Sequence, residues 1–166
     1  SKVFFSKNTD PSNPTKISSF LGVHSTDDLE KYLGMPLSHT RISPQNHAFL
    51  VDKIRQKLAG WKANLISFAG RKAIIQQVSS AMSSFYAHCA PLPKSTCDTI
   101  DKIQKDFLWG STTDKKKLHL VKWDAVATPL CQGGLGIRKT ADVNKAAMAG
   151  LCWRLRRQKD QPSAQI

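Results

Sequence analysis

The residues best placed to do chemistry form a basic cluster between positions 53 and 72. Its members are six cationic side chains: Lys53, Arg55, Lys57, Lys62, Arg71 and Lys72. Asp52 is the only acid between Phe49 and Lys72, so six positive charges and one negative charge leave a net charge of +5. Lysine and arginine bind nucleic-acid phosphates with little dependence on base sequence. The cluster predicts phosphate contact; a solvated face that keeps the protein soluble is the alternative.

The four tryptophans are a second set of candidate binding residues. Aromatic rings either stack on bases or anchor a core with one polar edge at the surface. Trp109 and Trp153 flank apolar helical faces, which favours the core. Trp61 stands beside Lys62 at the expected end of a helix, so it is the best candidate for stacking.

A second basic run consists of Lys115, Lys116 and Lys117. Three lysines in a polar loop are usually solvated, but they can also flank a nucleic-acid interface or form a weak nuclear-localisation signal. We include them among the candidate nucleic-acid-binding residues.

The sequence predicts neither a metal site nor a cofactor. The four cysteines are widely spaced, without the short separation that zinc requires, and are expected to be buried free thiols in a reducing compartment. His88 and Cys89 are adjacent, so on a helix they point about 100° apart and converge poorly on one ion. The Gly133-Gly134-Leu135-Gly136 run lacks the Lys-Ser/Thr of a phosphate-binding loop and is expected to be a tight turn.

The composition is that of one globular domain with an unusual charge. The chain has 166 residues, and 25 Lys and Arg against 12 Asp and Glu give a net charge of +13. Such a charge attracts polyanions, of which nucleic acid is the commonest and an anionic membrane the second. Residues 73–93 carry no charge but contain two Gln, four Ser and a His, which is too polar for a membrane span. We expect an intracellular protein, nuclear or cytoplasmic, without membrane contact.

Apolar periodicity predicts helices over most of the chain. Leu50, Ile54 and Leu58 recur every four residues, with Ser43 as N-cap, Pro44 at the first helical position and Gly60 at the end. Further helices are expected over residues 67–89, from 93 or 95 to 109, and over 140–157. Their expected buried faces comprise Ile75, Val78, Met82, Phe85 and Tyr86; Ile100, Ile103, Phe107 and Leu108; and Val143, Ala147 and Leu151.

The remaining elements are shorter. Residues 2–5 and 118–121 suit strands, and residues 31–37 suit a tight strand or hairpin punctuated by Gly34 and Pro36. Residues 17–23 fit either a short helix or a strand. Gly110 is a candidate C-terminal cap, residues 123–127 a helical turn, and residues 158–166 a disordered tail.

Five short phrases occur in one order along the chain: Tyr32-Leu33-Gly34-Met35-Pro36-Leu37, Gly60-Trp61-Lys62, Phe107-Leu108-Trp109-Gly110, Gly133-Gly134-Leu135-Gly136-Ile137 and Trp153-Arg154. Together they resemble the region just downstream of the polymerase active site in plant LINE-type (non-LTR) retrotransposon reverse transcriptases. The resemblance extends from about residue 1 to residue 157.

The resemblance implies a mainly α fold. Residues 1–43 would be a strand and turn segment similar to the end of a palm, residues 44–110 a thumb-like three-helix bundle, and residues 111–157 a C-terminal extension. Tyr32, Leu33 and Gly34 would correspond to the hairpin that grips a primer terminus; a glycine needed only for a tight turn is the alternative. The family's catalytic Tyr/Phe-Ala-Asp-Asp motif is absent, so we expect no enzyme, although the chain could be part of a larger RNA-directed DNA polymerase.

Two functions follow as hypotheses. In the first, a non-catalytic fragment of a reverse transcriptase holds a template–primer duplex of RNA or DNA non-specifically through basic helices. In the second, a domesticated retrotransposon-derived module interacts with another protein through an exposed apolar face and has no nucleic-acid function.

Overall fold

The computed structural model describes residues 2–5, 8–10, 13–26, 31–32, 35–36, 47–61, 63–111 and 117–157. These residues are mainly helical with four short strands, which confirms the predicted fold class. The chain divides into two compact units, Ser1–Ile42 and Ser43–Ile166, each described here by itself.

The first unit contains two small strand pairs. Strand β1 (Lys2–Phe4) pairs in parallel with β2 (His24–Thr26), and helix α1 (Asn13–Leu21) lies between them in the sequence, as the crossover of a parallel pair requires. The segment that fitted either a helix or a strand is thus mostly helical. Strands β3 (Lys31–Tyr32) and β4 (Met35–Pro36) pair antiparallel, which confirms the predicted hairpin.

The second unit begins with helix α2 (Ala48–Ala59). Leu50, Ile54 and Leu58 are buried, as their spacing predicts. Gly60 ends the helix, but with a φ of −61° it keeps the right-handed conformation and does not use the freedom of glycine. The expected start at Ser43 and Pro44 lies outside the described residues. A short 3-10 turn, η2 (Ala63–Leu65), follows.

One long helix follows in three segments: α3 (Phe68–Ile74), the π-helical turn η3 (Ile75–Ser79) and α4 (Ser80–Cys89). It matches the predicted helix over residues 67–89, and the Ser67 hydroxyl accepts a hydrogen bond from the Gly70 N–H at 3.2 Å as its N-cap.

The buried face of this long helix differs from the prediction. Ile75, Ser79 and Ser83 are buried, whereas Phe85 is 50% exposed. A π-turn places one extra residue in the helix, so the buried positions move by about one residue after it. The 3-and-4 spacing used for the prediction assumes an uninterrupted α-helix, and this explains the error at Phe85.

Helix α5 (Lys94–Trp109) ends at Gly110 in the left-handed conformation, with a φ of 68°. The Ser111 N–H donates to the Asp106 carbonyl at 2.8 Å and the Gly110 N–H to the Phe107 carbonyl at 3.1 Å. These are the two bonds of a Schellman cap, so the predicted C-terminal glycine is confirmed.

The segment after α5 is less regular than expected. Residues 118–121 form no strand in the part of the chain that the structure describes, and Leu118 and Leu120 are exposed. The turn expected at 123–127 is present as α6 (Trp123–Val126). After the 3-10 turn η4 (Leu130–Gln132), Gly133 and Gly136 both have positive φ, which confirms the tight glycine turn.

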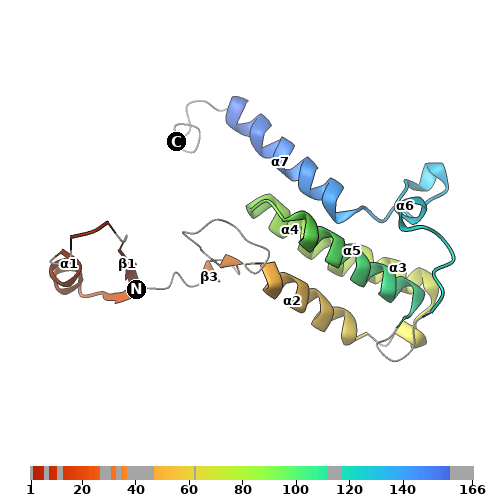
Figure 1. Cartoon of the computed structure of the whole chain (residues 1–166), viewed down its shortest axis with the longest axis horizontal. Helices are drawn as coiled ribbons and strands as arrows, with labels where there is room; N and C mark the ends of the chain where they lie inside the picture. Colours follow the sequence, from red (N-terminus) through yellow and green to blue (C-terminus); the bar gives the residue numbers. More distant parts are fainter. Residues whose placement is uncertain are drawn as a thin grey trace. The chain divides into compact units, whose positions relative to one another are not determined.

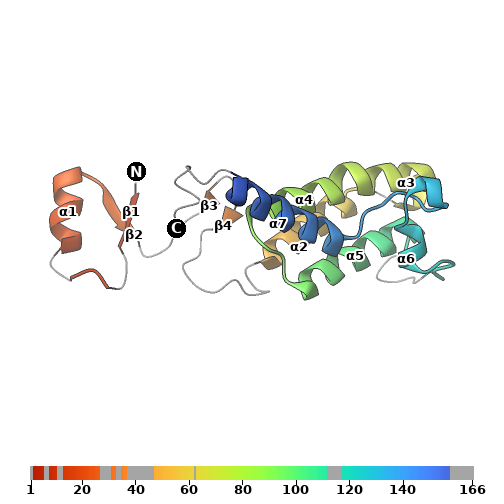
Figure 2. The same cartoon turned by 90° about the horizontal axis from the view of Figure 1, so that it is seen from above.

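Helix α7 (Thr140–Arg157) packs on α4 and α5. Figures 1 and 2 show α2 and α7 on opposite sides of the pair formed by α4 and α5. Ala147 is buried, but residues 149–157 are all exposed. Trp153, expected in the core, is 64% exposed, and Leu151 is 37% exposed. The prediction was wrong there because the last turns of this helix are not packed against the other described helices.

Candidate nucleic-acid interface

Helix α2 presents two lysines to solvent beside its buried face. Leu50, Ile54 and Leu58 fix the orientation of the helix, which packs on α5 and η3. Lys53 and Lys57 are both exposed and lie one helical turn apart, on one edge of this apolar face. Their ammonium groups are therefore carried by a helix that the core holds in place.

The opposite edge of α2 is electrically different. Arg55 lies about 160° around the helix from Lys57, because successive residues rotate by about 100°. Its Nη1 is 3.6 Å from Asp52 Oδ1, so the only acid of the basic cluster pairs with Arg55. Lys53 and Lys57 have no ion-pair partner among the described residues.

Trp61 follows directly after α2 and Gly60. Its backbone N–H donates to the Leu58 carbonyl at 3.1 Å, and the residue is 49% exposed. A half-exposed tryptophan therefore lies just beyond the helix that carries the two lysines.

Arg71 has a different role from the one expected for it. Its Nε donates to the Ile66 carbonyl at 3.1 Å and its Nη1 to the Leu108 carbonyl at 2.8 Å. Leu108 lies in the last turn of α5, where carbonyls lack partners within the helix. Arg71 thus holds α3 to the end of α5, and backbone carbonyls engage two of the N–H groups of its guanidinium.

The other predicted site residues are scattered. Lys72 is half-buried on α3, and Lys117 is exposed, with its backbone N–H donating to Ser111 Oγ at 3.1 Å. Tyr32 lies in β3 of the first unit. The remaining candidates lie outside the described residues: Leu33, Gly34, Lys62, Lys115 and Lys116.

Trp109 packs among other rings at the edge of the core. Its ring centroid is 5.8 Å from that of Phe68 and 6.4 Å from the stacked ring of His119. The His119 ring nitrogen lies 3.5 Å from Asp106 Oδ1. This arrangement confirms the structural role expected for Trp109.

The cysteines differ from the expectation of buried thiols. Cys97 is buried, and burial, with help from Asp101, raises the pKa of its thiol to about 11, so it stays protonated at neutral pH. Cys89, Cys131 and Cys152 are exposed. Within the described ranges, no three His, Cys, Asp or Glu side chains are placed to share a metal ion, and no helix is long and apolar enough to cross a membrane.

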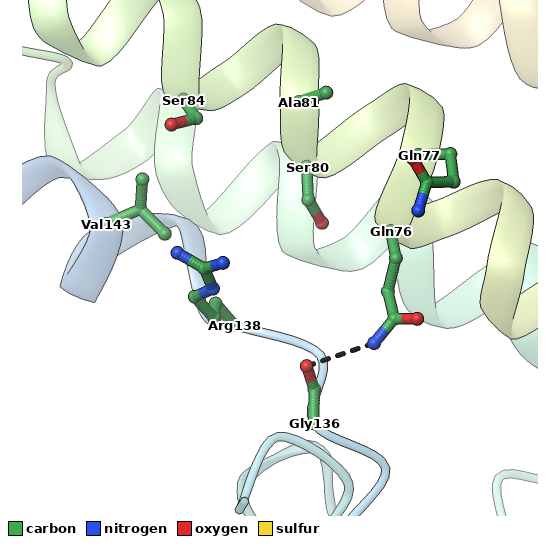
Figure 3. A pocket seen from close by; sticks show the side chains of 8 residues that line it. All are labelled: Gln76, Gln77, Ser80, Ala81, Ser84, Gly136, Arg138 and Val143. Atoms are coloured by element: carbon green, nitrogen blue, oxygen red, sulfur yellow. Dashed lines mark hydrogen bonds between the residues drawn. The ribbon is translucent and has the colours of Figure 1, made fainter.

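The sequence reasoning missed a polar pocket on the other side of the bundle from α2. Its lining residues are Gln76, Gln77, Ser80, Ala81, Ser84, Gly136, Arg138 and Val143 (Figure 3). The signal for it in the sequence is the group of polar residues inside the uncharged segment 73–93, which also argues against a membrane span.

Comparison with known proteins gave one informative relative. No protein-family model matches the chain. The chain is 36% identical over 126 residues to a protein of Arabidopsis thaliana named "Putative ribonuclease H protein". The match covers 76% of this chain but 20% of that protein, so the chain spans about a fifth of its relative's length.

This relative supports the general part of the predicted resemblance, which is a relation to plant retroelements. The match is to a plant protein named for a nucleic-acid enzyme, which agrees with a retroelement-related chain but does not identify a reverse transcriptase. It contradicts the expectation that the chain is no enzyme, because the relative carries an enzyme's name. The missing aspartate motif excluded one polymerase site in this segment, and it could not exclude part of another enzyme.

Proposed function

We propose that this chain is the duplex-holding part of a larger retroelement-derived enzyme that acts on nucleic acid. The observation that carries the proposal is the pair Lys53 and Lys57, exposed on one edge of α2 and without an acidic partner in the described structure. Phosphates along a nucleic-acid backbone supply the missing negative charge.

The chemistry of this edge favours binding that does not read base sequence. Two flexible ammonium groups contact phosphates as point charges and recognise no particular base. Trp61, half exposed beyond the end of α2, would add a surface on which a terminal or unpaired base stacks. The chain's net charge of +13 would bring the polyanion to this edge from a distance.

The finer assignment is to a reverse transcriptase of the plant LINE type. Under it, the second unit acts as the thumb that follows the duplex. Tyr32, Leu33 and Gly34 act as a primer grip when the rest of the polymerase is present. The ordered phrases of the sequence support this assignment, and the Arabidopsis relative's name supports nucleic acid as the substrate.

Titration of the chain with a labelled RNA–DNA duplex tests the proposal. Fluorescence anisotropy at a series of salt concentrations gives the affinity and its salt dependence. We expect log affinity to fall linearly with log salt, with a slope of about −0.9 for each phosphate contacted. Undetectable binding at low salt, or an affinity that does not change with salt, contradicts the proposal.

A second candidate function is protein interaction, because α7 exposes apolar side chains. Trp153 is 64% exposed, and Leu151 and Leu155 are each 37% exposed in the same turns. Added salt does not screen an apolar contact, whereas it weakens a phosphate contact. A protein complex that persists at high salt after nuclease treatment, and that Trp153→Ala abolishes, would favour this function over duplex binding.

A further inference from the structure

The polar pocket lies between the long helix and the segment that leads into α7. It has a volume of about 390 Å³. Gln76 and Gln77 come from the π-turn η3, and Ser80, Ala81 and Ser84 from the start of α4. The opposite wall is made by Gly136, Arg138 and Val143. Figure 3 shows the Arg138 guanidinium on one side of the pocket and the two glutamine side chains on the other.

The π-turn explains why these residues share a wall. The N–H of Ser80 bonds to the carbonyl of Ile75, five residues earlier. In an α-helix, the N–H bonds to the carbonyl four residues earlier. Such turns interrupt an α-helix and are frequent at functional sites. The turn buries Ser79 and leaves Gln76, Ser80 and Ser84, one turn apart from each other, along the pocket.

Ser80 has a buried hydroxyl with no partner. Its Oγ is inaccessible to solvent and makes no hydrogen bond within the described structure. Ser83, one turn later, shows the usual arrangement, since its Oγ donates to the Ser79 carbonyl at 3.0 Å. Buried polar atoms are nearly always bonded in folded proteins, so an unbonded hydroxyl beside a pocket points to a ligand.

The charges around the pocket favour an anion. Arg138 has no hydrogen-bond or ion-pair partner in the described structure, whereas its neighbour Lys139 pairs with Asp124. No acidic residue lines the pocket. Gln76 is already oriented, because its Nε2 donates to the Gly136 carbonyl at 3.2 Å.

We propose that this pocket binds a phosphate group, with Arg138 as the charged partner and the Ser80 and Ser84 hydroxyls as neutral donors. Guanidinium–phosphate pairs are charge-assisted and often bidentate, which makes Arg138 the main source of affinity. The pocket has the volume of a small-molecule site, so the phosphate can be carried by a nucleotide or by a nucleic-acid strand end. The inference does not depend on the duplex interface of α2, which lies on the other side of the bundle.

Two-dimensional NMR of the full chain, titrated with inorganic phosphate, tests the site. We expect phosphate to shift the side-chain amide signals of Gln76 and Gln77. Arg138→Gln should weaken binding about tenfold or more, because it removes a charged hydrogen-bonding group. Arg156→Gln removes the same charge from the exposed end of α7 and is the matched control; its affinity should stay within about twofold of the wild type.

Ser80→Ala separates a ligand role from a structural one. Removing a buried hydroxyl that has no partner should not lower the denaturation midpoint, yet it should weaken phosphate binding. Adenosine monophosphate and oligonucleotides with and without a 5′ phosphate then distinguish the sources. Binding of either phosphorylated probe that Arg138→Gln weakens supports the site and identifies the carrier.

Three results would overturn the proposal. The first is a phosphate affinity that Arg138→Gln leaves unchanged, or a titration in which phosphate shifts the NMR signals of many lysines but not those of Gln76 and Gln77. The second is acetate binding as tightly as phosphate, which would make the pocket a carboxylate site. The third is a loss of stability in Ser80→Ala with no change in phosphate affinity.

Discussion

At the scale of single residues, Arg71 illustrates how one basic side chain can serve the fold. Its guanidinium bonds two backbone carbonyls, one before α3 and one in the last turn of α5. The second carbonyl lies at the negative end of a helix dipole, where a cation is favourable. Two charged hydrogen bonds, of which the one to Leu108 joins parts of the chain 37 residues apart, should contribute measurably to stability.

We therefore expect Arg71→Ala to lower the free energy of unfolding by about 2 kcal/mol, as expected for hydrogen bonds to a charged group. Arg55→Ala is the control, because it removes an exposed arginine whose ion pair with Asp52 should contribute about 0.5 kcal/mol. Urea denaturation measures both. Equal losses in the two variants would show that Arg71 has no special structural role.

The carboxyl group of Asp101 can titrate, and it is hydrogen-bonded to the start of α7. Its Oδ1 accepts hydrogen bonds from the Thr140 N–H at 3.0 Å and from Thr140 Oγ1 at 2.6 Å. Burial raises the pKa of this carboxyl above 3.8 and outweighs the opposite effect of the two bonds. The folded chain therefore holds this proton more tightly than the unfolded chain does.

The sign of the pH effect follows from linkage. Because the folded state binds more protons at this site, its contribution to stability decreases as pH rises from about 3.8 through the raised pKa. Asp101→Asn can keep both bonds to Thr140 without titrating. We expect the stability of the wild type relative to this variant to fall across that window, measured by urea denaturation at several pH values. A relative stability that rises with pH would mean that the pKa is lowered.

At the scale of elements, α7 has two different halves. The Asn144 side chain holds the backbone of Leu92, accepting from its N–H and donating to its carbonyl, both at 3.0 Å. Ala147 is buried one turn later, and residues 149–157 are exposed. Local stability should therefore decrease along the helix.

Hydrogen exchange should show this gradient. We expect the backbone amides near Ala147 to exchange at least about tenfold more slowly than those of residues 151–157, because turns without packing open at low cost. Exchange followed by NMR or mass spectrometry resolves the two halves. Uniform protection up to Arg157 would instead mean that the last turns are covered in solution.

Apolar periodicity predicted where the helices lie. It did not predict the π-turn that interrupts the long helix, or the buried positions that follow the turn. Regular spacing placed Leu50, Ile54 and Leu58 correctly in the core. The π-turn has no characteristic residue type, so the sequence did not predict it. Hence Phe85 was expected inside and Ser83 was not. Gly110 was predictable because a left-handed cap has a strong preference for glycine.

At the scale of the whole molecule, charge is the main indicator of function. The excess of 13 positive charges was evident from the sequence, as was the basic cluster between positions 53 and 72. The sequence could not show which of these cations are free, because this depends on tertiary partners. Asp52 forms an ion pair with Arg55, and two backbone carbonyls accept hydrogen bonds from Arg71. Arg138, the candidate phosphate-binding residue of the polar pocket, belongs to no motif in the sequence.

The most direct test of the duplex-binding account is the salt dependence of affinity for α2 variants. Lys57→Gln and Arg55→Gln each remove one positive charge from the same helix on different edges. We predict that Lys57→Gln reduces the magnitude of the log affinity against log salt slope by about 0.9, that Lys53→Gln/Lys57→Gln reduces it by about 1.8, and that Arg55→Gln leaves it unchanged. Equal reductions for Lys57→Gln and Arg55→Gln, or an unchanged slope in the double variant, would contradict contact between this edge and the phosphates.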